Sequence, residues 1–326
     1  MERPAAVKDL AAVEIGAGIE LGFTPPDQAT DGQGLTKPLE IEIVRTIRQP
    51  GEKPGPAVLA TPVVLLQGAG LARRTAGGKV RYRDSLASAE FRRLARSALT
   101  YRVRGLTRGF RGRPIEGDWS NTITLQLLDV PEPPSGLGVE STASALQLHW
   151  SPPSETLTGK PVGSVTAYRI YRSDTGRAGP YHPAGDSSAT TFADSSFEFG
   201  HAYCYRVRAL VTEGNQTAES ADSASVEIVP RDVFPPAPPA GLTGLYTANA
   251  VELIWNANAE ADLAGYNIYR SGPGEQRVKL NAELLRSPLY HDPAVTSGRR
   301  YVYRVTAVDL KGNESAPSAE VSVDVP

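Results

Sequence analysis

The side chains that could do chemistry are few in this chain of 326 residues. The four histidines never recur at the H-x-x-H or H-E-x-x-H spacing of a zinc site. Cys204 is the only cysteine, so it can form neither an internal disulfide nor a thiolate pair. No G-x-S-x-G segment marks a serine nucleophile. We therefore expect no catalytic residue, no metal site and no cofactor, and a protein that is not an enzyme.

Two further motifs are better explained as turns. The segment GAGLARRTAGGKV (68–80) is rich in glycine, but Val80 follows Lys79 where a phosphate-binding loop needs Ser or Thr. It predicts a glycine-rich hairpin turn. Asn215 and Asn313 each begin a glycosylation sequon, and both follow a glycine at the same place in a repeated unit. Gly-Asn is favourable turn chemistry, so we interpret both as turns.

Charge is unevenly distributed in a chain whose net charge is −2. Residues 73–113 carry thirteen Lys or Arg against Asp84 and Glu90, a net charge of +11. One interpretation is that these arginines lie on solvated strand faces and acidic loops neutralise them. The other is an anion-binding face for an acidic polymer or a lipid headgroup. Aromatic residues are sparse here, so nucleic acid is not an expected partner. The candidate residues are Arg81, Arg83, Arg92, Arg93 and Arg96.

The chain repeats itself. YRIYRS (168–173) returns as YNIYRS (266–271), and YCYRVRAL (203–210) returns as YVYRVTAV (301–308), in both cases 98 residues later. Trp150 and Trp255 also correspond, but they are 105 residues apart. The seven-residue difference falls in one segment, SPPSETLTGKPVGSVTA, and such length changes are tolerated in surface loops.

Residues 1–130 hold a weaker copy of the same unit. Phe23 takes the place of Trp150, and TYRVRGL (100–106) stands for CYRVRAL, with Leu99 where the other copies carry a tyrosine. This copy has an extra segment, 46–98. Within it, DSLASAEFRRLARS (84–97) predicts a short helix capped by Asp84 or Ser85, because its apolar residues recur at helical spacing.

Alternating apolar residues, frequent turns and units near 100 residues predict antiparallel β-sandwiches. The Trp, the Y-x-I-Y-R and Y-x-Y-R-V-x-A segments and the G-N-x-S/T turn resemble fibronectin type III domains. We therefore expect an all-β protein of three tandem immunoglobulin-like sandwiches, the first divergent with a short helical insertion. The expected domains are 1–130, 131–231 and 232–326. The resemblance implies that Trp150, Trp255 and Phe23 fill the cores, and that Tyr203 and Tyr301 are corner tyrosines that bond to backbone.

A second candidate surface lies on the repeated strands. Alternation places Arg169 and Tyr171 on an outer face beside Arg206 and Arg208, and also beside a partly exposed Cys204. We expect Tyr171 to stack with Arg206. Such pairs can simply stabilise a sheet, but exposed Tyr and Arg are also common in protein interfaces, so another protein is a candidate partner.

The expected function is a non-catalytic spacer or protein-interaction module of the bacterial cell envelope. The chain also resembles acidobacterial-type envelope lipoproteins with an FTPP-bearing first domain, which implies an extracytoplasmic location and lipid anchoring through an upstream segment. No apolar run is long enough for a transmembrane segment. The alternative is a carbohydrate-associated accessory module of a polysaccharide-degrading system. A neighbouring catalytic domain would favour the alternative.

Overall fold

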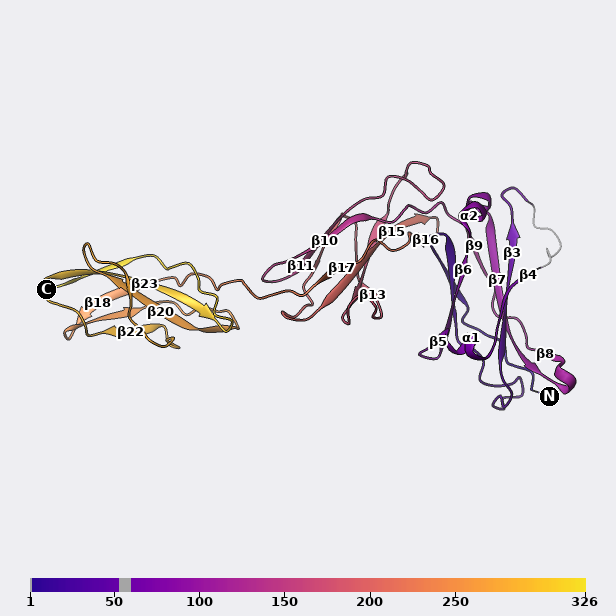
Figure 1. The fold of residues 1–326 in the computed structure, drawn as a ribbon, viewed down its shortest axis with the longest axis horizontal. Helices are drawn as coiled ribbons and strands as arrows, with labels where there is room; N and C mark the ends of the chain where they lie inside the picture. Colours follow the sequence, from indigo (N-terminus) through magenta and orange to yellow (C-terminus); the bar gives the residue numbers. More distant parts are fainter. Residues whose placement is uncertain (1, 53–59) are drawn as a thin grey trace. The chain divides into compact units, whose positions relative to one another are not determined.

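The computed structural model describes residues 2–52 and 60–326 and confirms the predicted all-β fold class. Figure 1 shows the strands and the two short α-helices, both of which belong to the first sandwich. Residues 53–59, part of the predicted insertion 46–98, lie outside the described residues. No helix in the described part of the chain is long and apolar enough to cross a membrane. The chain forms two compact units, one holding the first two sandwiches and the other the third.

The first sandwich packs two sheets around a core of apolar side chains from both. Helix α1 (Gly68–Ala72) leads into its glycine turn, where Gly77 and Gly78 have φ of +56° and +75° and join two strands as a hairpin. One sheet has β1 (Ala11–Ile15), β2 (Gly18–Phe23), β6 (Lys79–Ser85) and β5 (Thr75–Ala76). The other has β4 (Thr61–Leu66), β3 (Glu40–Arg48), β7 (Ala98–Arg108), β8 (Pro114–Glu116) and β9 (Ile123–Gln126).

The other two sandwiches repeat this plan, each with a three-stranded sheet facing a larger one. In the second, β10 (Ser135–Ser141), β11 (Leu146–Ser151) and β14 (Thr191–Asp194) face β13 (His182–Ser187), β12 (Ala167–Ser173), β15 (Tyr203–Glu213), β16 (Gln216–Glu219) and β17 (Val226–Ile228). In the third, β18 (Thr243–Thr247), β19 (Ala250–Ile254) and β22 (Leu289–Asp292) face β21 (Val278–Lys279), β20 (Leu263–Ser271), β23 (Arg299–Asp309) and β24 (Val321–Val325).

The alternating sequence pattern places the core residues as predicted. Along β11, Leu146, Leu148 and Trp150 are buried while the residues between them are exposed. Trp150 packs edge-on against Tyr168 with ring centroids 5.3 Å apart, and Trp255 packs the same way on Tyr266 at 5.2 Å. The corresponding Phe23 of the first sandwich is completely buried. The core positions of these three aromatic residues are therefore confirmed.

The predicted helix of the first sandwich is present but shorter than expected. Helix α2 spans Ser88–Leu94 and buries Phe91 and Leu94. The residue before it, Ala87, is the N-cap, and no side chain caps the helix. The prediction of Asp84 or Ser85 as the cap was wrong, because both belong to β6 and continue its pairing with β2. The strand propensity of the preceding VRYR segment extends the strand into the expected helix start.

A buried aspartate occupies the same place in all three sandwiches. Each lies on a strand that pairs with the strand that contains or directly precedes the core aromatic residue. One of its oxygens, Oδ2, accepts two hydrogen bonds of 2.7–2.8 Å. One comes from an arginine and the other from a tyrosine hydroxyl. The three sets are Arg45–Asp84–Tyr101, Arg172–Asp194–Tyr205 and Arg270–Asp292–Tyr303. This shared arrangement identifies the divergent first sandwich as a copy of the same unit.

In the first sandwich, the arginine of this arrangement contacts a glutamate where the other two sandwiches have an aromatic ring. In the other two, the arginine also lies over the ring of a corner tyrosine, Tyr203 or Tyr301, at 4.9 Å. The hydroxyl of Tyr301 accepts a hydrogen bond from the backbone N–H of Thr296, as the resemblance implied. The first sandwich has the buried Leu99 at this place, and Arg45 instead pairs with Glu90 of α2 at 3.0 Å. The helical insertion thus supplies a partner for the arginine.

The first two sandwiches share one continuous sheet. Strand β1 pairs in parallel with β16, with Glu14 opposite Ala218 and Ile15 opposite Glu219. Gln216 also makes two hydrogen bonds with the backbone of Gln126, at 2.6 and 2.8 Å. We call this pairing of β1 with β16 the seam. Ala218 is fully buried in the core of the first sandwich, so the seam joins the two sandwiches into one body.

The longer loop of the second sandwich contributes to the same joint. The backbone N–H of Leu157 donates to the carbonyl of Val130 at 3.0 Å, and Thr158 donates to the carboxylate of Asp129. Leu157 also packs on the core of the first sandwich. The longer loop therefore docks on the joint between the first two sandwiches, a role that its length alone did not indicate.

Candidate interaction surfaces

The outer face of the second sandwich brings together the four residues predicted for an interaction surface. Arg169 and Tyr171 lie on β12, and Arg206 and Arg208 lie on the neighbouring β15. Their strands pair so that Arg169 is opposite Arg208 and Tyr171 is opposite Arg206. The structure therefore places these four side chains on one face, as the alternation of the strands requires.

This face is electrically balanced, because its three arginines meet three carboxylates. Glu219 lies at the centre with only 4% of its surface exposed, and it also accepts a hydrogen bond of 2.8 Å from the hydroxyl of Tyr171. Burial and the bond to Glu219 raise the pKa of Tyr171 to about 12. The ion pairs, of 2.6–3.2 Å, are Arg169–Asp186, Arg169–Glu219, Arg206–Asp222, Arg208–Asp222 and Arg208–Glu219. Because each of these arginines is paired with a carboxylate, the face has little net positive charge to attract an external anion.

The aromatic partners on this face differ from the expected ones. Arg208 lies over the ring of Tyr171 at 4.5 Å, whereas Arg206 lies over Tyr181 at 3.9 Å. Cys204 is fully buried, contrary to the expectation of partial exposure, and the hydroxyl of Tyr181 approaches its Sγ at 3.1 Å. Tyr181 covers this part of the strand, which sequence alternation could not indicate because Tyr181 precedes β13 and belongs to no strand.

The candidate anion-binding residues of the first sandwich are exposed but come from separate elements. Arg81 and Arg83 lie on the same outer face of β6, separated by Tyr82. Arg83 donates a hydrogen bond of 2.7 Å to the carbonyl of Ile15. Arg92 and Arg93 lie on α2, and Arg96 follows that helix. Within the described residues none of these five forms an ion pair. Binding of an anion by this set stays a prediction.

A different part of the basic segment, which the sequence analysis did not single out, carries an exposed aromatic ring. The turn between β7 and β8 contains Phe110, of which 82% is exposed, in a short 3-10 turn, η1 (Phe110–Gly112). The sequence signal is RGFRGR (108–113), where the other two sandwiches have short Gly-Asn turns. An apolar residue inside an arginine-rich turn is the sequence signal for this exposed ring, and a count of charges does not register it.

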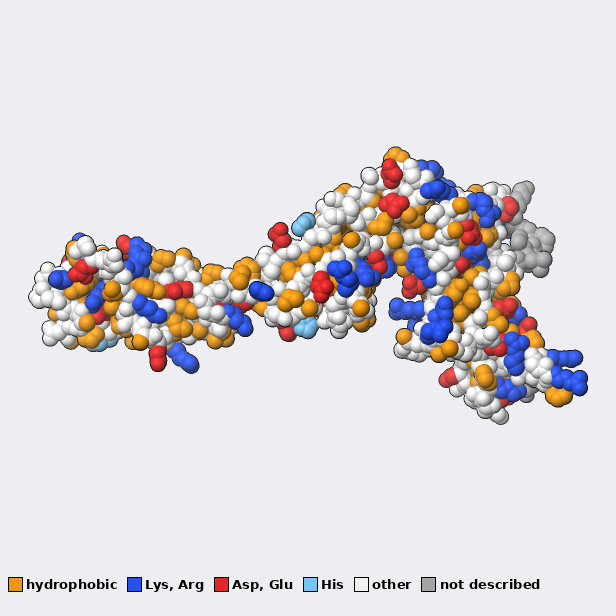
Figure 2. Space-filling model, viewed as in Figure 1, with side chains coloured by type: hydrophobic (Ala, Val, Ile, Leu, Met, Phe, Trp, Pro, Cys, Tyr) orange, Lys and Arg blue, Asp and Glu red, His pale blue; other side chains and the backbone are white. Residues whose placement is uncertain are grey.

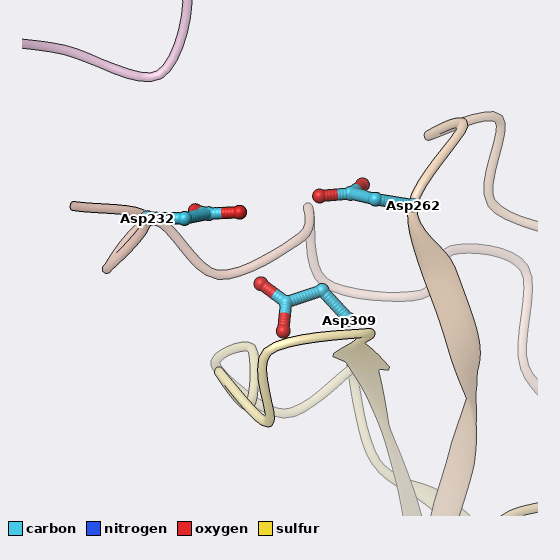
Figure 3. A group of neighbouring side chains, drawn as sticks. All are labelled: Asp232, Asp262 and Asp309. Atoms are coloured by element: carbon cyan, nitrogen blue, oxygen red, sulfur yellow. The ribbon is translucent and has the colours of Figure 1, made fainter. Parts of the chain in front are cut away.

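Three aspartates converge at one end of the third sandwich. Figure 3 shows the carboxylates of Asp232, Asp262 and Asp309 facing one another, and their oxygens lie within 4.8 Å. Carboxylate oxygens of this kind are ligands that Ca²⁺ accepts. However, Asp309 is already engaged by its own turn, where it accepts hydrogen bonds from the backbone of Lys311 and from Asn313. Burial opposes its ionisation, but these hydrogen bonds dominate and lower the pKa of Asp309. The position of the Asp309 carboxylate is therefore explained by its own turn.

Comparison with known proteins finds similarity over parts of this chain. No family model matches it. It is 35% identical to exoglucanase B of Cellulomonas fimi over 164 residues, which are 49% of this chain and 14% of that protein. It is 31% identical to exoglucanase A of the same organism over 213 residues, 62% of this chain and 22% of that protein. It is also 41% identical to an amylopullulanase of Thermoanaerobacter thermohydrosulfuricus over 86 residues, 26% of this chain and 6% of that protein.

Solved structures give more distant similarities. The FN1–FN3 domains of chicken CNTN1 align over 100% of this chain and 99% of that chain, with 14% identity and a TM-score of 0.28. The chicken interferon gamma receptor alpha chain aligns over 60% of this chain and 98% of that chain, with 18% identity and a TM-score of 0.39. The three sequence relatives named above are long proteins, and this chain matches only a minor part of each.

Proposed function

We propose that this chain is a non-catalytic accessory module of a polysaccharide-degrading system, in which it holds other parts of that system apart. The observation that carries the proposal is the 35% identity to exoglucanase B over a region that is 14% of that protein. The matched region is a minor part of that enzyme, as is expected for a module that accompanies a separate catalytic domain. The amylopullulanase shares a still smaller part.

The structure supports the spacer role through the seam. A spacer must keep a fixed length under thermal motion, and inter-domain contacts through linkers alone generally allow relative movement. Here the backbone pairing of β1 with β16 and the burial of Ala218 fix the first sandwich to the second. The ion pairs around Glu219 lie beside the seam and stiffen the same sheet.

An extracellular location belongs to the same proposal. Glucan and chitin polymers are too large to enter a cell, so a module that assists their degradation would act outside it. The envelope location and the lipid anchor expected from the sequence are consistent with this role, and they remain part of the proposal. A cell-surface anchor would hold the degrading system close to the cell that takes up its products.

Distance measurements by pulsed electron paramagnetic resonance test the spacer role. Spin labels on exposed positions Ser88 of α2 and Gln147 of β11, in a Cys204→Ala background, report the separation of the first two sandwiches. A narrow distribution is expected, similar to that of a control pair within the second sandwich, Gln147 and Glu227. A distribution several times broader than the control would show that the sandwiches pivot, and the spacer proposal would be abandoned.

The non-catalytic part of the proposal has its own assay. Incubation of the full chain with soluble β-glucan, starch and chitin oligomers should release no reducing ends above a blank. Depletion assays on insoluble cellulose, starch and chitin should show no retention. Hydrolysis of any substrate would make the chain an enzyme, and tight retention on one polymer would make it a carbohydrate-binding module.

A further inference from the structure

The turn Gly109–Arg113, here called the tip, projects a hydrophobic residue into solvent. Phe110 is 82% exposed, more than any other large hydrophobic residue among those described. Figure 2 shows basic and hydrophobic side chains together at the end of the first sandwich where Figure 1 places β8. Arg111 has a φ of +54°, a left-handed conformation that is unfavourable for a residue with a side chain. The tip therefore keeps an apolar ring exposed at a cost in conformational energy.

At the tip of this hairpin the arginine charges are exposed and unpaired, whereas most of those below it have partners; Arg102 of β7 forms no ion pair with a described residue but lies over the ring of Trp119 at 5.0 Å. Below the tip, Arg104 pairs with Glu42 and Glu116, and Arg108 pairs with Glu40. At the tip, by contrast, Arg111 and Arg113 are exposed and form no ion pair with any described residue. The guanidinium of Arg111 lies 5.3 Å from the centre of the Phe110 ring, so the cation and the apolar surface are adjacent. An acceptor for this tip must offer negative charge next to an apolar region.

The backbone of the tip is already hydrogen-bonded within the protein. The N–H of Gly109 donates to the carbonyl of Arg113, the N–H of Gly112 donates to Gly109, and the N–H of Arg113 donates to Phe110. The carbonyl of Gly112 accepts a hydrogen bond from the side chain of Arg108 at 3.3 Å. Backbone groups without partners oppose entry into an apolar medium. The tip has satisfied most of them in advance, which favours contact with lipid.

The shape and charge of the tip distinguish among acceptors. Cellulose, starch and chitin carry no anionic groups, so they give Arg111 and Arg113 nothing to bind. A lone projecting ring also provides no groove or flat platform for a sugar chain. A bilayer surface, in contrast, deforms around a projecting side chain. It offers phosphates to arginines whose alkyl stems lie along the apolar boundary.

We propose that the tip docks this protein on bilayers that contain anionic phospholipids. Phe110 enters the boundary between headgroups and acyl chains, and Arg111 and Arg113 bind lipid phosphates. The corresponding turns of the other two sandwiches contain Gly-Asn and lack this Phe-Arg combination. Membrane contact is thus a property of the first sandwich. It is independent of the proposed spacer role, because it depends on neither the seam nor any carbohydrate.

Vesicle sedimentation with the full chain tests the proposal. Vesicles of phosphatidylcholine and phosphatidylglycerol in equal amounts should bind the protein, and pure phosphatidylcholine vesicles should bind it at least tenfold less. Phe110→Ala should lower the partition coefficient roughly tenfold, because it removes the burial of one aromatic side chain. Arg111→Gln and Arg113→Gln should each lower it about fivefold. In a Phe110→Trp variant, the emission should shift to the blue on binding and be quenched by brominated lipids.

Two matched controls separate the tip from general charge and hydrophobicity. Leu310→Ala removes an apolar side chain that is 71% exposed in the corresponding turn of the third sandwich. Arg277→Gln with Arg286→Gln removes two exposed charges of the third sandwich that form no ion pair with a described residue. Both controls should bind like the unmodified chain. All of these positions are exposed, so thermal melting should be unchanged.

Three outcomes would overturn the proposal. The first is no binding to anionic vesicles at low salt. The second is an equal loss of binding in the control variants, which would show non-specific attraction. The third is Phe110-dependent binding to soluble polygalacturonate without binding to vesicles, which would assign the tip to acidic polysaccharide.

Discussion

The hydroxyl of Tyr101 donates a hydrogen bond of 2.7 Å to Oδ2 of Asp84, a carboxylate oxygen that Arg45 also reaches at 2.8 Å. The same relationship recurs between Tyr205 and Asp194 and between Tyr303 and Asp292. Burial, reinforced by the aspartate in each case, raises the pKa of all three tyrosines far above the ordinary value. These hydroxyls therefore stay protonated and remain donors.

Removing one of these aspartates should strongly destabilise its sandwich. Asp292→Ala leaves the arginine charge and the Tyr303 hydroxyl without their acceptor, and breaking a buried pair in this way costs about 3–5 kcal/mol. Chemical denaturation followed by far-UV circular dichroism measures the effect. Asp324→Ala serves as a control, because its ion pair with Arg300 is on the surface and its loss should leave the midpoint unchanged. Equal small effects of both variants would contradict a structural role for Asp292.

Substitution of the two core tryptophans should destabilise regions of different extent. Trp255→Ala and Trp150→Ala should each cost about 3–5 kcal/mol, the usual result of emptying an aromatic core position. Hydrogen exchange should increase only in the third sandwich for Trp255→Ala. For Trp150→Ala it should also increase along β1, because the seam couples the first sandwich to the second. Unchanged exchange along β1 in the Trp150 variant would argue against this coupling.

Stability should depend on pH through Glu14, which lies at the seam. Glu14 is 1% exposed, the N–H of Leu128 donates to its Oε2 at 3.0 Å, and Oε1 has no partner among the described residues. Burial raises its pKa to about 8, and the nearby Asp129 and Glu213 add to this effect. The folded state thus holds a proton that the unfolded chain releases near pH 4.5. Folding stability is therefore lost as the pH rises from about 5 to 8.

Comparison with Glu14→Gln measures this loss. The unfolding free energy of the variant, relative to the unmodified chain, should rise by roughly 4–5 kcal/mol between pH 5 and 9, because each unit of pKa shift corresponds to about 1.4 kcal/mol. Glu20→Gln, on the adjacent strand β2, is the matched control for the removal of a carboxylate from this sheet. A pH-independent difference for Glu14→Gln would mean that this carboxyl ionises normally.

The thiol of Cys204 should be unreactive in the folded protein. It is fully buried beneath Tyr181, whose hydroxyl lies 3.1 Å from Sγ. The aromatic disulfide reagent DTNB should therefore modify it only at the rate of unfolding, and Tyr181→Ala should accelerate the reaction. Rapid modification of the unaltered protein would show that the thiol is accessible.

The sequence predicted the features that depend on local periodicity. Alternation along β11 located Trp150, and the repeated strands located Arg169 and Arg208 on a common face. It could not predict that Glu219 would balance both arginines, because Glu219 lies on another strand whose position depends on tertiary pairing. The helix start at Asp84 was also mispredicted, since its role as acceptor for Arg45 and Tyr101 is visible only in three dimensions.

The parallel pairing of β1 with β16 has a practical consequence for dividing this protein. An edge strand presents unpaired N–H and carbonyl groups that can pair with a second molecule, and natural sheets usually protect such edges. In this chain β1 covers that side of β16. A fragment begun at residue 131 would uncover it, together with the buried face of Ala218. Fragments cut between the first and second sandwiches should therefore self-associate, and the two sandwiches are best produced together.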